Sequence, residues 1–353
     1  MESIKDSLTF DDVTLVPQYS SILPTDAITS CKLSKKLNLR IPLISSAMDT
    51  VTESKMSIAI SKSGGIGVIH RNLSINKQVE EVQKVKRKNY IVGAAIGVGF
   101  KDLERAEELS RINTDLIVID TAHGHTKKVL NMIKKIKKKL KNSTLCVGNI
   151  ATGKAAIFLA DSGVDIVKVG IGPGSICTTR LVAGIGVPQL SAVMEVKKAL
   201  KKYKTKIISD GGIKFSGDLA KAIAAGADAI MIGSLFSGTT ESPGKIIKYK
   251  GNLYKNFRGM GSVGAMNAGS ADRYYQKKNN DIAKYVPEGV EGMVKFKGSV
   301  KEIIFNLIGG LKSSMGYMGA KSITELQKKG KFIKISKAGF YESMVHNVDH
   351  IKK

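Results

Sequence analysis

The sequence contains no tryptophan, only three cysteines, and 30 acidic residues against 56 basic ones. Cys31, Cys146 and Cys177 are odd in number and widely separated, which argues against a disulfide scaffold and favours a reducing compartment, the cytoplasm. No apolar run approaches the ~18 residues that a membrane-spanning helix needs. The charged Glu2 and Lys5 stand where a signal peptide would carry an apolar core. The sequence therefore predicts a soluble cytoplasmic protein with no membrane partner.

The net charge of +26 suits nucleic acids, anionic membrane surfaces or anionic small molecules as partners. The densest basic run is 134–141, where Ile133, Ile136 and Leu140 share one side of a helix. This spacing predicts a solvated helix face. The run lacks the arginine and interleaved aromatic residues that are typical of nucleic-acid-binding surfaces. We therefore expect nucleic-acid binding to be a secondary property at most.

Hydrophobic residues make up 42% of the 353 residues, which is enough for a large core. Short apolar runs alternate with amphipathic stretches over most of the chain. Eight strand-then-helix units favour a closed parallel (β/α)8 barrel, the TIM barrel, over a doubly wound open sheet. We expect a single catalytic domain over residues 1–353. The expected strands are 41–48, 65–70, 90–98, 115–120, 144–150, 165–170, 206–210 and 229–234, and the helices between them include 53–63, 101–112, 126–140, 152–162, 190–201 and 217–225.

The alternating pattern stops after the eighth expected strand. Residues 235–299 are rich in glycine and polar residues and lack a steady period, which is typical of a lid, a binding loop or a disordered linker. Helical periodicity returns at 300–311. From residue 330 onward the tail has no clear period, although it carries Glu342 and His346.

Polar residues and glycines gather at the carboxyl ends of the expected strands. Barrel enzymes build their sites on that rim, often with a phosphate cradle after strands seven and eight, so these residues predict one site. Alternatives remain open, because Asp120 could cap a helix, Asn149 could be a turn residue and Met48 could belong to the core. The rim candidates are Ser46, Met48, Asp49, His70, Asp120, His123, Asn149, the segment 170–179, Asp210, Gly211, Gly212, Gly233 and Ser234.

The segment 170–179, with the sequence GIGPGSICTT, is the most informative stretch. Its three glycines let backbone groups approach a ligand closely, and Ser175 adds a hydroxyl suited to an anion. Cys177 stands in this polar turn, where a thiolate is a strong nucleophile once its pKa falls. We expect Cys31 and Cys146 to be small buried hydrophobic residues instead.

Two glycine-containing strand ends predict a phosphate cradle built from backbone amides. The first is Asp210-Gly211-Gly212 and the second is Gly233-Ser234. Asp210 is placed to accept hydrogen bonds from sugar hydroxyls. An Asp-Gly pair is also ordinary turn chemistry, so the recurrence at two successive strands carries the prediction.

Six segments, 8–13, 45–53, 64–70, 170–180, 209–213 and 258–262, resemble the inosine-5′-monophosphate (IMP) dehydrogenases. The resemblance covers nearly the whole chain, and the glycine-cysteine segment is shared with the related guanosine-5′-monophosphate (GMP) reductases. It implies the oxidation of IMP to xanthosine monophosphate (XMP) with NAD and water, the committed step of guanine nucleotide synthesis.

The resemblance also implies roles for individual residues. Cys177 matches the nucleophile that attacks C2 of the purine; hydride then passes to NAD, and the covalent thioimidate is hydrolysed. A potassium ion is implied between the carbonyls of Gly172, Gly174 and Cys177 and a second half from a neighbouring subunit of a homotetramer. The half from the neighbouring subunit matches Glu342, Ser343 and Met344. The residues that match IMP-binding positions are Ser46, Met48, Ser175, Asp210, Gly211, Gly212, Gly233, Ser234, Met260, Gly261 and Glu288. Those that match NAD-binding positions are Asp120, Thr121, Ala122, Asn149 and Gly170.

Hydrolysis in these enzymes uses a mobile flap, which the resemblance places within 257–299. Arg273 and Tyr274 match its catalytic pair, with Arg273 as the base that activates water, although a guanidinium normally stays protonated. Without the resemblance, Arg273 would be interpreted as a phosphate clamp. Thr179 and Glu288 match a second proton relay, and Glu288 indicates the microbial type. Phe257 stands where many members carry a tyrosine whose hydroxyl contacts the phosphate.

The family normally carries a pair of regulatory cystathionine-synthase-like (CBS) domains, inserted after the second barrel unit. This chain lacks them there, because residues 86–89 run directly into 90–93. GMP reductase normally lacks them too and is the main alternative. Against it stand Thr52-Glu53, the segment 258–262 and the flap motifs at 272–274 and 288–289. The reductase needs no flap that activates water.

Overall fold

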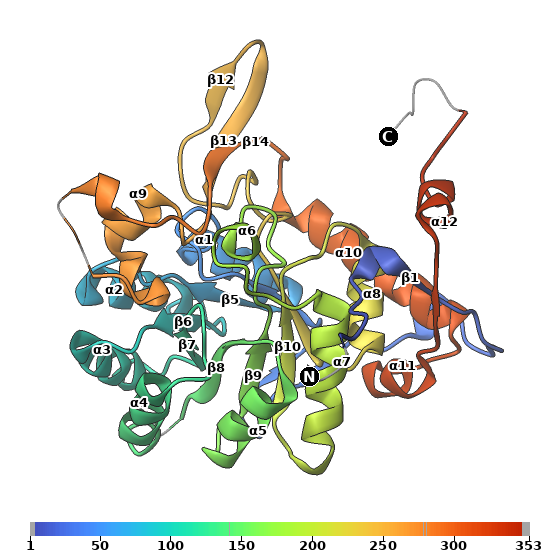
Figure 1. Ribbon diagram of the computed structural model, residues 1–353, viewed down its shortest axis with the longest axis horizontal. Coiled ribbons are helices and arrows are strands. Elements are labelled where there is room, and N and C mark those ends of the chain that lie inside the picture. Colours follow the sequence, from blue (N-terminus) through green and yellow to red (C-terminus); the bar gives the residue numbers. More distant parts are fainter. Residues whose placement is uncertain (1–3, 141, 278, 280, 348–353) are drawn as a thin grey trace.

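The protein is described by a computed structural model that covers residues 4–140, 142–277, 279 and 281–347. Eight parallel strands close into a barrel in the order β10-β11-β4-β5-β6-β7-β8-β9, which confirms the predicted TIM barrel and excludes the open doubly wound sheet. The barrel and the helices around it are drawn in Figure 1. The strands are β4 (Leu43–Ser45), β5 (Ile66–Ile69), β6 (Gly93–Ile96), β7 (Leu116–Asp120), β8 (Thr144–Ile150), β9 (Ile166–Val169), β10 (Lys206–Asp210) and β11 (Ala229–Ile232).

Helices follow the strands and cover the outside of the barrel. Several begin at a hydroxyl residue whose oxygen accepts a backbone N–H of the first turn, as Ser74 does for Lys77 and Thr152 does for Ala155. The first helix ends at Gly64, whose φ of 105° is a left-handed conformation that glycine adopts without strain. The surrounding helices are α1 (Ser54–Ser63), α2 (Ile75–Lys86), α3 (Phe100–Arg111), α4 (Lys127–Lys137), α5 (Gly153–Asp161), α7 (Gln189–Ala199), α8 (Ser216–Ala224) and α10 (Val300–Tyr317).

The core has two main parts. Inward-facing side chains of the strands fill the barrel, and they pack with Leu33, Leu37 and Leu39 of the segment carrying the short hairpin β2 (Cys31–Lys32) and β3 (Asn38–Leu39). The second and larger part lies between the strands and the helices. Cys31 and Cys146 are buried in the first part, which confirms their expected role as small hydrophobic residues.

The segment after β11 is more ordered than its composition predicts. It forms a three-stranded antiparallel sheet of β12 (Ile247–Tyr249), β13 (Asn252–Arg258) and β14 (Glu291–Lys295), which projects from the barrel in Figure 1. Between β13 and β14 the chain folds over the carboxyl ends of the strands, through the short helix α9 (Val263–Ala265) and turns up to Tyr274. The sequence pattern therefore missed the three strands of this segment.

The C-terminal tail also has structure that the sequence pattern misses. After α11 (Ile323–Lys329), the strand β15 (Phe332–Lys334) pairs antiparallel with β1 (Val13–Leu15). The helix α12 (Lys337–Glu342) follows and lies well apart from the flap segment at α9 in Figure 1. No helix among the described residues is long and apolar enough to cross a membrane.

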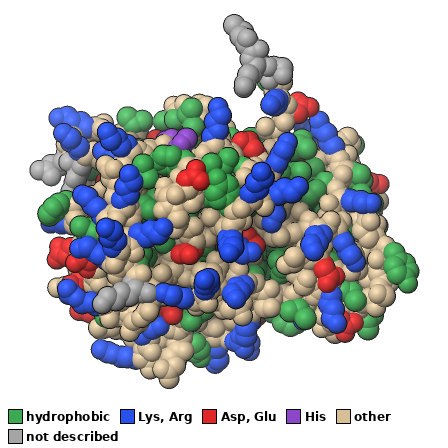
Figure 2. All heavy atoms as spheres, turned by 90° about the horizontal axis from the view of Figure 1, so that it is seen from below, with side chains coloured by type: hydrophobic (Ala, Val, Ile, Leu, Met, Phe, Trp, Pro, Cys, Tyr) green, Lys and Arg blue, Asp and Glu red, His purple; other side chains and the backbone are tan. Residues whose placement is uncertain are grey.

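The lysines of the basic run from 134 to 139 lie on the exposed face of α4 and the turn after it, while Val129, Met132, Ile133 and Ile136 are buried. This confirms the predicted solvated helix face. Lys141, the last residue of the predicted run, lies outside the described residues. Figure 2 shows lysine and arginine side chains scattered over one whole face of the molecule, with acidic side chains between them.

Candidate active site

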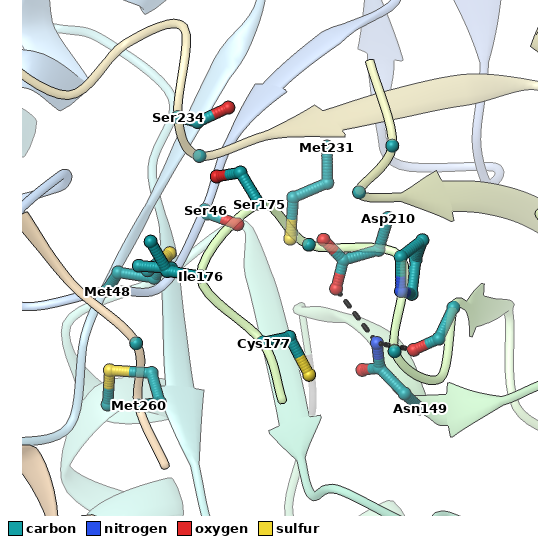
Figure 3. Close-up of a pocket in the computed structure, with 18 of the residues that line it drawn as sticks. Ser46, Met48, Asn149, Ser175, Ile176, Cys177, Asp210, Met231, Ser234 and Met260 are labelled. Atoms are coloured by element: carbon teal, nitrogen blue, oxygen red, sulfur yellow. Dashed lines mark hydrogen bonds between the residues drawn. The ribbon is translucent and has the colours of Figure 1, made fainter. Parts of the chain in front are cut away.

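A cavity of about 150 Å³ opens at the carboxyl ends of the barrel strands. Its wall unites strand ends far apart in sequence with the 170–177 loop and with residues of the flap. Figure 3 shows Cys177, Asp210, Asn149 and Ser234 arranged around it. Of the residues singled out from the sequence, the wall contains Ser46, Met48, Asp120, Asn149, Gly170, Gly172, Gly174, Ser175, Cys177, Asp210, Gly211, Gly212, Gly233, Ser234, Met260, Arg273, Tyr274 and Glu288.

Four predicted site residues lie just behind the wall. Thr179 contacts Cys177, and Gly261 packs so closely under Tyr274 that an added Cβ would lie 2.7 Å from the tyrosine ring. The hydroxyl of Thr121 donates to the carbonyl of Gly148, so this side chain faces the backbone of β8. The amide of Ala122 is already engaged, because it donates to the carbonyl of Arg273.

Glu342, Ser343 and Met344 are not brought to the cavity. They lie exposed at the end of α12, which stands apart from α6 (Thr179–Val182) beside the cysteine loop in Figure 1. Within the described part of one chain, the two predicted halves of the potassium site therefore do not meet.

The cysteine loop is held by backbone contacts on both sides. Gly172 has a φ of 85°, and an added Cβ there would lie 2.5 Å from Cγ of Arg180. The guanidinium of Arg180 donates to the carbonyls of Ile171 and Val187. From the flap side, the carbonyl of Glu288 accepts the amide of Thr178 at 3.0 Å. The loop is thus fixed beneath the flap.

Cys177 differs from the other two cysteines in exposure and in surroundings. Its thiol is half-buried and lies 3.2 Å from the hydroxyl of Thr179. Burial raises the pKa of both Cys31 and Cys146 to about 12, because the charged thiolate is disfavoured away from water. Among the three thiols, Cys177 alone faces the cavity, as its turn context predicted.

A buried lysine that the sequence analysis missed organises the opposite wall of the cavity. Lys168 comes from β9, its side chain is only 2% exposed, and its ammonium lies 3.1 Å from Asp120 and 2.6 Å from Asp210. It also donates to the side-chain oxygen of Asn149. The amide of Asn149 donates in turn to Asp210 and to the carbonyl of Gly170. One cation therefore neutralises carboxylates at two strand ends and ties four strands together.

The geometry decides the open alternatives for three rim residues. Asp120 is not a helix cap, because the hydroxyl of Thr126 caps α4 by accepting the amide of Val129. Asn149 is not a turn residue, because it lies within β8 and its side chain bonds across the cavity wall. Met48 packs against the core and also lines the cavity.

The flap residues Asp272, Arg273 and Tyr275 are docked onto the barrel rim. Arg71 at the end of β5 donates through two nitrogens to Asp272, at 2.9 and 3.1 Å. The guanidinium of Arg273 pairs with the carboxylate of Asp120. The hydroxyl of Tyr275 donates to the carbonyl of His123 at 2.5 Å. This segment therefore packs against the rim of the barrel in the structure.

Burial changes the acid-base properties of the flap pair. It lowers the pKa of the Arg273 guanidinium, while the neighbouring Tyr274 opposes that shift. It raises the pKa of the Tyr274 hydroxyl, and Arg273 opposes that shift in turn. The carbon at the centre of the guanidinium lies 6.0 Å from the centroid of the tyrosine ring. The pair shares one desolvated pocket.

Gly211 and Gly212 shape the other end of the cavity. Their φ values are 92° and 84°, left-handed conformations that favour glycine. An added Cβ at Gly233 would lie 3.1 Å from the sulfur of Met48, so backbone and side chain are in direct contact there. Phe257 also lines the cavity and is 4% exposed.

Comparisons with known proteins identify the family of the chain. The IMP dehydrogenase / GMP reductase domain matches residues 7–346. Inosine-5′-monophosphate dehydrogenase of Borreliella burgdorferi is 46% identical, over 98% of this chain and 98% of the relative. The enzyme of the same name from Cryptosporidium parvum is 45% identical over 100% of this chain and 98% of the relative. The enzyme of the same name from Aquifex aeolicus is 40% identical over 98% of this chain and 96% of the relative. That alignment has 476 positions and is longer than this chain of 353 residues. The chain belongs to the IMP dehydrogenase / GMP reductase family.

Proposed function

We propose that this protein is an oxidoreductase that converts IMP to XMP with NAD and water, in guanine nucleotide synthesis. The observation that carries the proposal is the position of Cys177, half-buried on a glycine-built loop in the same cavity as the strand-end glycines and the docked Arg273. The relatives named as IMP dehydrogenases support the same substrate.

In the proposed reaction, the Cys177 sulfur attacks C2 of the purine as a thiolate. The thiol proton leaves first, and the hydroxyl of Thr179, 3.2 Å away, is the nearest group to receive a hydrogen bond from it. NAD, when bound, supplies the acceptor for the hydride that leaves C2. Water then adds to C2 of the thioimidate on Cys177, the C–S bond breaks, and XMP departs with the thiolate restored.

The flap residues Arg273 and Tyr274 are proposed to serve the hydrolytic half of the reaction. Burial lowers the pKa of Arg273, which is the direction required for a guanidinium to accept a proton from water. Thr179 and Glu288 form the proposed second relay, and both adjoin the cysteine loop through Cys177 and the amide of Thr178.

The nicotinamide side of the proposed site comprises Asp120, Thr121, Ala122, Asn149 and Gly170. With the flap closed, Arg273 already occupies the carboxylate of Asp120 and the amide of Ala122. NAD and the docked flap therefore compete for this wall. We propose that hydride transfer takes place with the flap away from the rim and hydrolysis with the flap docked.

We also propose a potassium ion and a homotetramer. Backbone carbonyls are ligands that potassium accepts, and Gly172, Gly174 and Cys177 lie on one short turn in which an added Cβ at Gly172 would clash with Arg180. Such an ion would hold the cysteine loop in shape. A second copy of the chain would have to bring Glu342, Ser343 and Met344 to it, because one chain does not.

We propose that the chain is a single catalytic domain without the CBS pair. Helix α2 ends at Lys86 and β6 begins at Gly93, so a short connection joins them where the family carries the insert. The three free cysteines support placing the protein in the cytoplasm.

Incubation with IMP and NAD tests the dehydrogenase assignment. We expect NADH absorbance to appear and XMP to accumulate. The alternative, GMP reductase, would instead consume NADPH with GMP and release ammonia and IMP. Activity of that kind without NADH formation from IMP would overturn the proposal.

Weak nucleic-acid binding is proposed only as a secondary property. It rests on the net charge of +26 and on the basic side chains scattered over the face in Figure 2. Binding through phosphates must weaken steeply as salt rises. A salt titration with a DNA fragment tests it, and binding that is undetectable or independent of salt would contradict it.

A further inference from the structure

The part of the cavity wall that carries Ser175 and Ser234 (Figure 3) has no cation of its own. Among the described residues that line the cavity, the only cations are Lys168 and Arg273, and both are engaged with carboxylates. A phosphate monoester carries a charge of about −1.5 to −2 at neutral pH. Hydroxyls and backbone amides alone would have to hold that charge.

Lys297 lies directly behind this end of the cavity. Its ammonium donates to the carbonyl of Ser234 at 2.6 Å and to that of Leu235 at 3.3 Å. Its side chain is partly buried, and no carboxylate among the described residues pairs with it. Burial lowers the pKa of Lys297, and no counter-charge offsets this effect. Its positive charge is therefore available to an anion near Ser234.

The turn that Lys297 contacts has a defined direction. The amides of Phe236 and Ser237 both donate to the carbonyl of Gly233 at 3.0 Å, which makes a single helical turn beginning at Gly233. In such a turn the carbonyls point along the chain and the first amides point back toward its start. Lys297 binds the carbonyl side. The amides of Ser234 and Leu235 consequently point toward the strand end, where Gly233 and Ser234 line the cavity.

We propose that Lys297 is a positioning residue of the phosphate cradle. It holds the carbonyls of the Ser234-Leu235 turn and supplies the positive charge that this part of the cavity wall lacks. The inference rests on the proposed function, because it assumes that the nucleotide phosphate binds at this end. Lys297 contacts the phosphate only through the turn, so its loss weakens the binding of phosphorylated ligands and leaves the chemistry at Cys177 intact.

Protection of the Cys177 thiol from alkylation by iodoacetamide measures binding without relying on turnover. We expect IMP to protect the wild-type protein, and Lys297→Met and Lys297→Gln to raise the half-protecting IMP concentration about tenfold, as expected for a charge-assisted interaction. The half-protecting concentration of inosine, which lacks the phosphate, should stay within about twofold, and Lys297→Arg should keep most of the IMP affinity. In turnover, KM for IMP should rise while kcat stays within about twofold.

The matched control is Lys255→Met. Lys255 is a second buried lysine of the same region, and it donates to the carbonyls of Thr239 and Ser242 rather than to the cradle. We expect it to leave the IMP half-protecting concentration unchanged. The role of Lys297 would be overturned if the half-protecting concentrations of IMP and inosine rose equally, if only kcat fell, or if Lys297→Gln left the half-protecting IMP concentration unchanged. Failure of IMP to protect the wild-type protein would instead refute the proposed function itself.

Discussion

The ion pair between Arg71 and Asp272 joins the barrel rim to the flap across 201 residues of sequence. Two parallel hydrogen bonds form it, and the Arg71 side chain is only 7% exposed, whereas that of Asp272 is 44% exposed. An added Cβ at Gly97 would lie 3.0 Å from both partners, so the pair rests on the end of β6. We predict that Asp272→Asn shifts the flap toward its open state.

The free energy that the Arg71–Asp272 pair contributes to the docked flap follows from its geometry and exposure. A hydrogen bond to a charged group contributes about 1.5–3 kcal/mol when shielded from water, but the exposure of Asp272 brings the value nearer to ~1 kcal/mol. That energy reduces the closed-to-open ratio about fivefold. Under the proposed mechanism only hydrolysis needs the docked flap, so steady-state turnover should fall by about the same factor.

Stopped-flow measurement of NADH separates the two halves of the reaction. In Asp272→Asn the initial NADH burst should keep its rate, and only the later phase should slow. Asp281→Asn is the matched control, because its exposed carboxylate lies on the same segment and pairs only weakly with Lys284 at 3.8 Å. Equal slowing of both phases, or wild-type turnover, would refute the reasoning. Arg71→Met combined with Asp272→Asn should slow turnover no more than the stronger single variant.

Four further outcomes follow from the site. Cys177→Ala should abolish NADH formation while IMP still binds by calorimetry; surviving turnover would remove Cys177 as nucleophile. Arg273→Ala should slow the steady state and preserve the NADH burst, and a burst slowed to the same degree would exclude Arg273 from hydrolysis. Phe257→Tyr should lower KM for IMP about fivefold, since a new neutral hydrogen bond contributes ~1 kcal/mol, and an unchanged KM would mean that the hydroxyl does not reach the phosphate. Burial raises the pKa of Cys31 and Cys146 from about 9.0 to about 12, so these two thiols should make the free energy of unfolding decline between pH 9 and pH 12 and contribute no pH dependence below pH 9. Cys146→Ala should show a shallower decline over that range in denaturant titrations, and an identical slope would contradict this.

The barrel and most of the rim could be predicted because both depend on local patterns. Each strand is a short apolar run, such as β7 with all five residues buried, and its carboxyl end immediately carries the functional side chain Asp120. Parallel strands in a closed barrel then bring those ends together without further information.

The remaining elements have no such local signal. Strands β12 and β14 have no buried residue, so no apolar period marks them. The β1–β15 pairing joins three-residue strands from opposite ends of the chain. Lys168 is one polar residue in an otherwise apolar strand, and its importance depends on Asp120, Asn149 and Asp210, which come from three other strands. A single charged residue inside a buried run was the signal that could have found it.

The charge balance around Asp120 explains how one wall can serve both halves of the proposed reaction. Asp120 faces two cations with the flap docked, the fixed Lys168 and the movable Arg273. In the proposed open state Arg273 would leave, one positive charge would be lost from a desolvated wall, and the positively charged ring of oxidised nicotinamide would restore the balance. Reduction makes that ring neutral, so Asp120 then favours the return of Arg273. Under the proposed mechanism, the carboxylate would thereby couple the oxidation state of the nicotinamide to the position of the flap, with Lys168 holding the wall in place in both states.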